Sequence, residues 1–172
     1  TFIIRHVGQQ LFENYIELNF AEDYNGPRLF EQVRTAKDFY FQVSTIAGER
    51  MGEKKNTLLF LDEIQAYPHL LTMLKFLKQD DRYTYIASGS LLGVTLKKTT
   101  SIPIGSIEVK RMFPLDFEEF LLANGFNRFA IDMMHEMFLT GESLDAAMHE
   151  KVMDLFKKYL LIGGLPDAVN SF

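Results

Sequence analysis

The stretch Leu58-Leu59-Phe60-Leu61-Asp62-Glu63 places four apolar residues directly before two adjacent carboxylates. A short unbroken apolar run is typical of a strand that is buried on both faces, as in parallel sheets covered by helices. Acids that follow such a strand lie at the carboxyl edge of the sheet, where open α/β sheets bind their ligands. The stretch therefore predicts a buried strand that delivers Asp62 and Glu63 to a ligand-binding edge.

The same stretch has the form of a Walker B segment. In that chemistry Asp62 would hold Mg²⁺ through its water shell, and Glu63 would orient and polarise the water that attacks a γ-phosphate. A buried strand that ends in a solvated acidic turn is the alternative interpretation of these residues, because short motifs also occur by chance.

Strand-like and helical segments alternate on both sides of this stretch. Apolar residues at helical spacing predict helices at residues 2–13, 28–50 and 68–80. Clusters of aromatic and β-branched residues predict further strands at residues 15–20, 83–87 and 107–112. Because alternating strands and helices build mostly parallel sheets, we expect an α/β fold.

From Pro114 onward the pattern predicts helices only. Asp116 and Glu119 have the spacing of a capping box at the start of one helix. We expect Ser143 to cap a longer helix that ends at Gly163-Gly164. The change of pattern predicts a boundary near residue 113, with an α/β core at 1–113 and a helical segment at 114–172.

Composition limits the class of protein. A chain of 172 residues with 47% hydrophobic residues is long enough for one packed domain with a small appendage. A net charge of -5 disfavours a dedicated nucleic-acid-binding protein. The absence of cysteine excludes disulfides and thiolate metal sites. No apolar stretch approaches the ~18 residues of a membrane span, so we expect a cytoplasmic protein.

Four segments, in their order along the chain, resemble the prokaryotic AAA+-type ATPases in which a nucleotide-binding core precedes a helical lid and a carboxy-terminal domain of unknown function. These segments are Leu59–Gln65 (LFLDEIQ), Ile86–Leu92 (IASGSLL), Phe113–Leu121 (FPLDFEEFL) and Tyr159–Pro166 (YLLIGGLP). The resemblance implies that residues 1–113 are a partial nucleotide-binding core of the P-loop NTPase class and that residues 114–172 are a helical lid segment. It also implies ATP and Mg²⁺ as cofactors, and ATP hydrolysis as the activity.

The resemblance also shows what this sequence lacks. Family members carry a Gly-rich phosphate loop that ends in Gly-Lys-Thr, and no such loop occurs here. Thr1 leads directly into a predicted helix, as the last residue of that loop would, and would then bind Mg²⁺ and the nucleotide together with Asp62. An ordinary helix cap is the alternative for Thr1. We therefore expect a fragment that lacks the loop and its strand, and that is inactive alone.

Further residues follow from the same resemblance. Ser88 would be the polar sensor that contacts the attacking water or a phosphate, with Ser90 as the alternative, and Glu63 and Ser88 would then be the catalytic residues. Gln65 is either a catalytic contact or a structural hydrogen bond. Relatives often carry a Gly-Arg pair whose arginine acts on the nucleotide of a neighbouring subunit. The resemblance is therefore compatible with oligomerisation. Here Ser106 follows Gly105, so Lys110 or Arg111 would substitute, unless both are solvated charges on an edge strand.

A second class of function fits the same chain. The apolar helices at 114–172 would serve a non-catalytic adaptor that docks a protein partner. Zinc chemistry is disfavoured because the histidines lack the spacing of a helical zinc site; they are His6, His69, His135 and His149.

Overall fold

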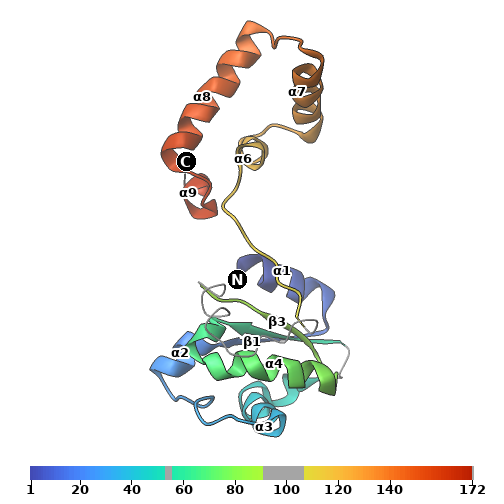
Figure 1. Ribbon diagram of the computed structural model, residues 1–172, viewed down its shortest axis with the longest axis vertical. Helices are drawn as coiled ribbons and strands as arrows, with labels where there is room; N and C mark the ends of the chain where they lie inside the picture. The colour runs from blue at the N-terminus through green and yellow to red at the C-terminus, as the bar shows by residue number, and fades with distance from the viewer. Residues whose placement is uncertain (53–55, 91–106, 172) are drawn as a thin grey trace. The chain divides into compact units, whose positions relative to one another are not determined.

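The computed structural model describes residues 1–52, 56–90 and 107–171, and it divides the chain into two compact units (Figure 1). The first unit comprises Thr1–Val109 and the second Lys110–Phe172. The division lies close to the boundary predicted near residue 113. Each unit has its own hydrophobic core.

The first unit is built on a parallel sheet. Its strands are β1 (Asn14–Asn19), β2 (Thr57–Asp62) and β3 (Thr84–Ala87), in the order β1-β2-β3. Every residue of β2 is buried, as the unbroken apolar run predicts for a strand covered on both faces. The prediction of an α/β fold with a mostly parallel sheet is confirmed.

Helices cover both faces of this sheet. They are α1 (Phe2–Leu11), α2 (Phe20–Asn25), α3 (Ala36–Ala47) and α4 (Pro68–Asp80), with 3-10 turns η1 (Gly48–Met51) and η2 (Ile64–Ala66). Helices α3 and α4 lie on one face and α1 lies on the other (Figure 1). The main core joins alternate strand residues to α3 and α4; it includes Ile16, Leu18, Leu59, Leu61, Phe39, Val43, Leu70 and Leu77.

Two features hold α1 against the sheet. Gly8 is buried, and a Cβ atom at this position would lie 2.7 Å from the Tyr15 ring and 2.8 Å from the Leu58 side chain. One turn earlier, Arg5 Nε donates to Glu17 Oε2 on β1 at 2.9 Å. The hydrogen bond from Arg5 lowers the pKa of Glu17. These contacts fix the distance of α1 from the sheet and the rotation of α1 about its own axis.

Replacing Gly8 by valine is expected to lower the free energy of unfolding by about 2 kcal/mol, because the added atoms overlap a packed ring and a buried leucine. Valine has no worse helix propensity than glycine, so the loss reports the clash alone. Thermal unfolding followed by circular dichroism measures the effect. Gln10→Val, on the exposed side of the same helix, is the matched control. Equal stability of the two variants would contradict close packing at Gly8.

The predicted helix at 28–50 is wrong at its start, because α3 begins only at Ala36. Asp23 accepts hydrogen bonds from the backbone N–H groups of Leu29 (3.0 Å) and Phe30 (3.2 Å), and these bonds hold the chain in turns. A capping box of Thr35 and Asp38 then starts α3. The short helix α2 that supplies Asp23 was not predicted.

The predicted strand at 107–112 is also wrong, since residues 107–116 belong to neither a helix nor a strand. Its β-branched residues suggested the strand. However, Val109 is 56% exposed and Met112 is 75% exposed, so the apolar positions do not form a buried face. Without such a face, β-propensity alone does not produce a strand.

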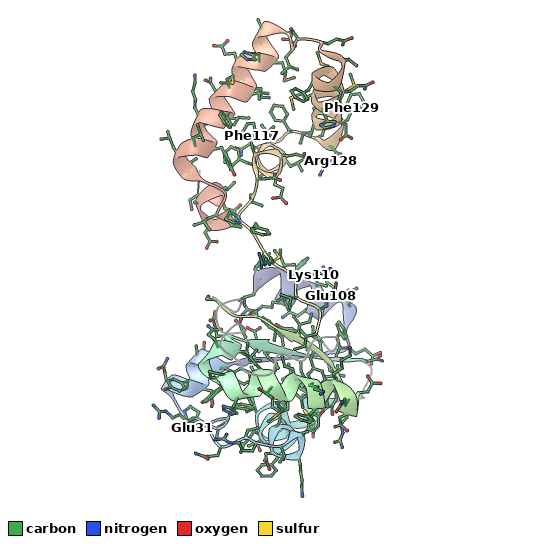
Figure 2. All side chains as sticks on the ribbon, viewed as in Figure 1. Glu31, Glu108, Lys110, Phe117, Arg128 and Phe129 are labelled. Atoms are coloured by element: carbon green, nitrogen blue, oxygen red, sulfur yellow. The ribbon has the colours of Figure 1, made fainter. Side chains whose placement is uncertain are left out.

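The second unit is helical, as predicted. It contains α6 (Phe117–Ala123), α7 (Arg128–Thr140), α8 (Ala146–Ile162) and α9 (Pro166–Asn170). Phe117 is the first residue of α6 (Figure 2), and its ring packs 5.0 Å from the Phe156 ring of α8, measured between centroids. The core of the unit consists of Phe120, Leu121, Phe126, Ile131, Leu155 and Val169.

Helix starts in this unit agree with the sequence in one case and differ in another. The capping box of Asp116 and Glu119 at the start of α6 is confirmed. The predicted cap of α8 at Ser143 is wrong, because the Asp145 carboxylate accepts from the Met148 N–H at 3.0 Å instead. Aspartate caps as well as serine does, and Asp145 directly precedes the first helical residue. Helix α7 was not predicted.

Two of the segments that carry the family resemblance meet in this unit. The Leu115 N–H donates to the Gly164 carbonyl at 2.7 Å, and the Tyr159 hydroxyl donates to the Leu115 carbonyl at 3.0 Å. A Cβ atom at position 164 would lie 1.9 Å from the Leu115 carbonyl oxygen. Only glycine allows this close approach of two backbone segments.

Candidate functional site

The carboxyl ends of the three strands bring polar residues to one edge of the sheet. Asp62 is the last residue of β2, and it is aligned with Asn19 at the end of β1. Ser88 directly follows β3, whose last residue Ala87 is aligned with Leu61. Two backbone hydrogen bonds lock this edge: Ser88 N–H to the Leu61 carbonyl at 2.9 Å and Ile64 N–H to the Ser88 carbonyl at 3.0 Å. Ligands of open α/β sheets bind at such an edge.

Asp62 is the centre of the site. Its side chain is buried, with 5% exposure. Thr1 Oγ1 lies 3.2 Å from each of its two carboxylate oxygens, and Ser88 Oγ donates to Oδ1. The Glu63 N–H also donates to Oδ1, at 3.2 Å. A buried carboxylate is thus surrounded by hydroxyl and amide donors from three places: the N-cap of α1, the residue after β3, and the end of its own strand.

Thr1 occupies the N-cap position of α1, yet its side chain makes no capping hydrogen bond. Its hydroxyl contacts Asp62 instead, 61 residues along the chain. The first N–H groups of the ten-residue helix therefore lack the side-chain acceptor that an N-cap threonine usually provides. Both the hydroxyl and the positive end of the helix dipole are consequently near the buried carboxylate.

Glu63 has an unusual backbone conformation and a different partner. Its φ of 54° and ψ of 43° are left-handed, a conformation that costs a residue other than glycine about 1 kcal/mol or more. Its carboxylate Oε2 accepts from Gln65 Nε2. Among the described residues, its carboxylate makes no hydrogen bond to Thr1, Asp62 or Ser88. The structure thus brings together three of the four predicted site residues and holds the fourth beside Gln65.

The oxygen donors at this edge fit Mg²⁺. No group of three or more His, Cys, Asp or Glu residues is arranged to hold a metal within 1–52, 56–90 and 107–171. Mg²⁺ keeps several waters and needs only one or two carboxylates in addition to phosphate oxygens. The Asp62 carboxylate and the Thr1 hydroxyl are hard oxygen ligands of that kind. They would suffice for a magnesium ion that is shared with a phosphate.

The other predicted residues are exposed, belong to the second unit or lie outside the described residues. Ser90, the alternative to Ser88, is exposed. Lys110 and Arg111, the candidates for an arginine finger, are exposed in the segment that is neither helix nor strand. Ser106 lies outside the described residues. Asn19 is aligned with Asp62, but its side chain caps α2 by accepting from the Ala21 and Glu22 N–H groups.

A comparison with protein families matches residues 1–121 to the family described as an AAA domain. The chain belongs to this AAA domain family. The match covers most of the chain, includes the whole α/β unit with the group around Asp62, and ends inside α6. Searches of curated proteins and of solved structures gave no match. Among the described residues, no helix is long and apolar enough to cross a membrane.

Family membership confirms the resemblance to AAA-type ATPases, so the chain carries an ATPase-like domain of the P-loop class. The position of Thr1 next to Asp62 was expected from the resemblance rather than from the residues. Two features of this AAA domain were missed. The first is the close packing at Gly8, for which a glycine inside the amphipathic helix α1 was the sequence signal. The contact between Glu63 and Gln65 had no sequence signal, because it depends on the left-handed backbone at Glu63.

Proposed function

We propose that this chain supplies the metal side and the hydrolytic side of an ATP site in a Mg²⁺-dependent ATPase. The observation that carries the proposal is the contact of Thr1 Oγ1 with both oxygens of Asp62, 3.2 Å away, with the Ser88 hydroxyl on the same carboxylate. Membership of the AAA domain family supports ATP as the ligand.

Each residue has a distinct role in this proposal. Asp62 and Thr1 hold Mg²⁺, which neutralises charge on the β- and γ-phosphates. Asp62 accepts hydrogen bonds from the water shell of the ion, and its burial keeps the carboxylate in place. Ser88, fixed at the end of β3, donates to a phosphate oxygen or to the attacking water. Glu63 orients that water and accepts its proton.

A phosphate loop is the part of the site that these 172 residues do not contain. Such a loop cradles phosphates with backbone N–H groups, and its lysine reaches the β- and γ-phosphates. The experiments join a loop of this kind ahead of Thr1, where α1 begins. We call this chain with the joined loop the complete ATPase.

Asp62→Asn in the complete ATPase tests the metal role. We expect the Mg²⁺ concentration for half-maximal turnover to rise about 10-fold or more, because the amide lacks the charge that attracts the hydrated ion. ATP turnover measured against Mg²⁺ concentration gives the result. Asp81→Asn, at an exposed acid that ends α4, is the control. An unchanged Mg²⁺ requirement in Asp62→Asn would refute this role.

A second candidate function is a protein-binding role for the helical unit. It is favoured by large apolar side chains that are exposed on α7 and α8, among them Phe129 (72%), Phe138 (81%) and Leu161 (88%). Exposed apolar surface of this kind is typical of interaction sites. Unlike the ATPase proposal, an adaptor role alone predicts no ATP turnover that depends on Asp62 or Glu63. Cytoplasmic location and oligomerisation stay predictions from the sequence.

A further inference from the structure

Gln65 lies in η2, two residues after Glu63, and only one end of its amide is paired. Its Nε2 donates to Glu63 Oε2, whereas its Oε1 is buried and has no hydrogen-bond partner among the described residues. Buried polar atoms nearly always have a partner, so an exception needs a reason. The amide is oriented to serve the Glu63 carboxylate while its own carbonyl stays unpaired.

The turn that carries Gln65 is fixed to the sheet. Ile64 is fully buried, and its N–H donates to the Ser88 carbonyl at 3.0 Å. The Ala66 N–H donates to the Glu63 carbonyl at 3.0 Å, which closes the turn around Gln65. Because the backbone is held on both sides, the Gln65 amide meets Glu63 in a fixed place. Such support from a neighbouring residue is what holds a reactive group in its working orientation.

A purely structural role for Gln65 explains these contacts poorly. A glutamine that stabilises a turn gains from pairing both ends of its amide, and here the unpaired carbonyl offsets the gain from the single bond. A hydrogen bond to an ionised carboxylate is also directional and stronger than a neutral one. The contact therefore restrains Glu63 while adding little to stability.

We propose that Gln65 is a positioning residue. It holds Oε2 of the Glu63 carboxylate, so that Oε1 of the same Glu63 carboxylate faces the attacking water. This inference rests on the proposed role of Glu63 as the residue that orients that water. It also gives a function to the left-handed backbone of Glu63, which brings the two side chains together in so short a turn.

The test replaces Gln65 by methionine, which keeps the length of the side chain and removes the donor. In the complete ATPase we expect kcat to fall about 10- to 100-fold with KM for ATP unchanged, because a misplaced catalytic group slows the chemical step alone. The melting midpoint of the 172-residue chain should not fall. Gln65→Glu, which has no donor and adds a like charge beside Glu63, should lower kcat at least as far. Gln10→Met on α1 is the control.

A wild-type kcat in either Gln65 variant overturns the proposal. A lower melting midpoint with loss of kcat in Gln65→Met, combined with normal kcat in Gln65→Glu, also overturns it in favour of a structural role. Glu63→Gln is measured in parallel. If Glu63→Gln retains turnover, the proposed function itself fails; if only the Gln65 variants retain turnover, the inference about Gln65 fails and the proposed function stands.

Discussion

Replacing Glu63 by glutamine in the complete ATPase is expected to lower ATP turnover about 10²- to 10⁴-fold while Mg-ATP binding is retained. The amide keeps the size of the side chain but cannot accept a proton from the attacking water. Asp62 and Thr1, which are proposed to hold the metal, are unchanged, so affinity should persist. Phosphate release under saturating ATP measures turnover, and equilibrium titration with Mg-ATP measures binding.

Glu13→Gln is the matched control for this prediction. Glu13 is an exposed acid between α1 and β1, so the same chemical change there should leave both turnover and binding unchanged. If Glu63→Gln hydrolysed ATP at the wild-type rate, Glu63 would not be the residue that activates water. If it lost ATP binding instead, Glu63 would belong to the binding site rather than to the hydrolytic step.

The Gly164→Ala substitution is expected to cause the largest loss of stability in the helical unit. The added Cβ would lie 1.9 Å from the Leu115 carbonyl oxygen and 2.8 Å from the Leu115 N and C atoms. All three are backbone atoms, so no side-chain rotation relieves the overlap. We expect a loss of about 3 kcal/mol or more, with the backbone contact between Leu115 and Gly164 broken.

Gly163→Ala separates this clash from the effect of backbone conformation. Gly163 has a φ of 75°, and an added Cβ there would meet no atom of the described residues within 4 Å. Alanine at this position therefore causes no clash but costs about 1–3 kcal/mol of backbone strain, because φ 75° with ψ -170° is a conformation that essentially only glycine adopts. Hydrogen exchange across residues 110–171 compares the two variants. Faster exchange in α8 and α9 of Gly164→Ala than of Gly163→Ala is the expected result, and equal protection would contradict it.

Local patterns were sufficient to predict the central strand and its edge. Leu58 to Leu61 form an unbroken apolar run, and a strand with this pattern has to be buried on both faces. The acids that follow it consequently lie at the carboxyl edge. The start of α6 was predicted for a similar reason, because its capping box lies within four consecutive residues.

Contacts between distant residues set the limit of such prediction. Residues 28–35 have helical spacing, but Asp23 and its bonds to Leu29 and Phe30 keep them in turns. Residues 107–112 have strand-like alternation without the buried face that a strand needs. Within the site, the contact of Thr1 with Asp62 was expected only through the family resemblance. The pairing of Glu63 with Gln65 depends on a backbone conformation that no local pattern indicates.

The most direct measurement is a crystal structure of the complete ATPase with Mg²⁺ and a non-hydrolysable ATP analogue. We predict the ion beside the carboxyl end of β2, with Thr1 Oγ1 as a ligand at about 2.1 Å and Asp62 within hydrogen-bonding distance of a metal-bound water. An ion and γ-phosphate bound away from Asp62, with the direct contact between Thr1 and Asp62 still closed, would contradict the proposed site.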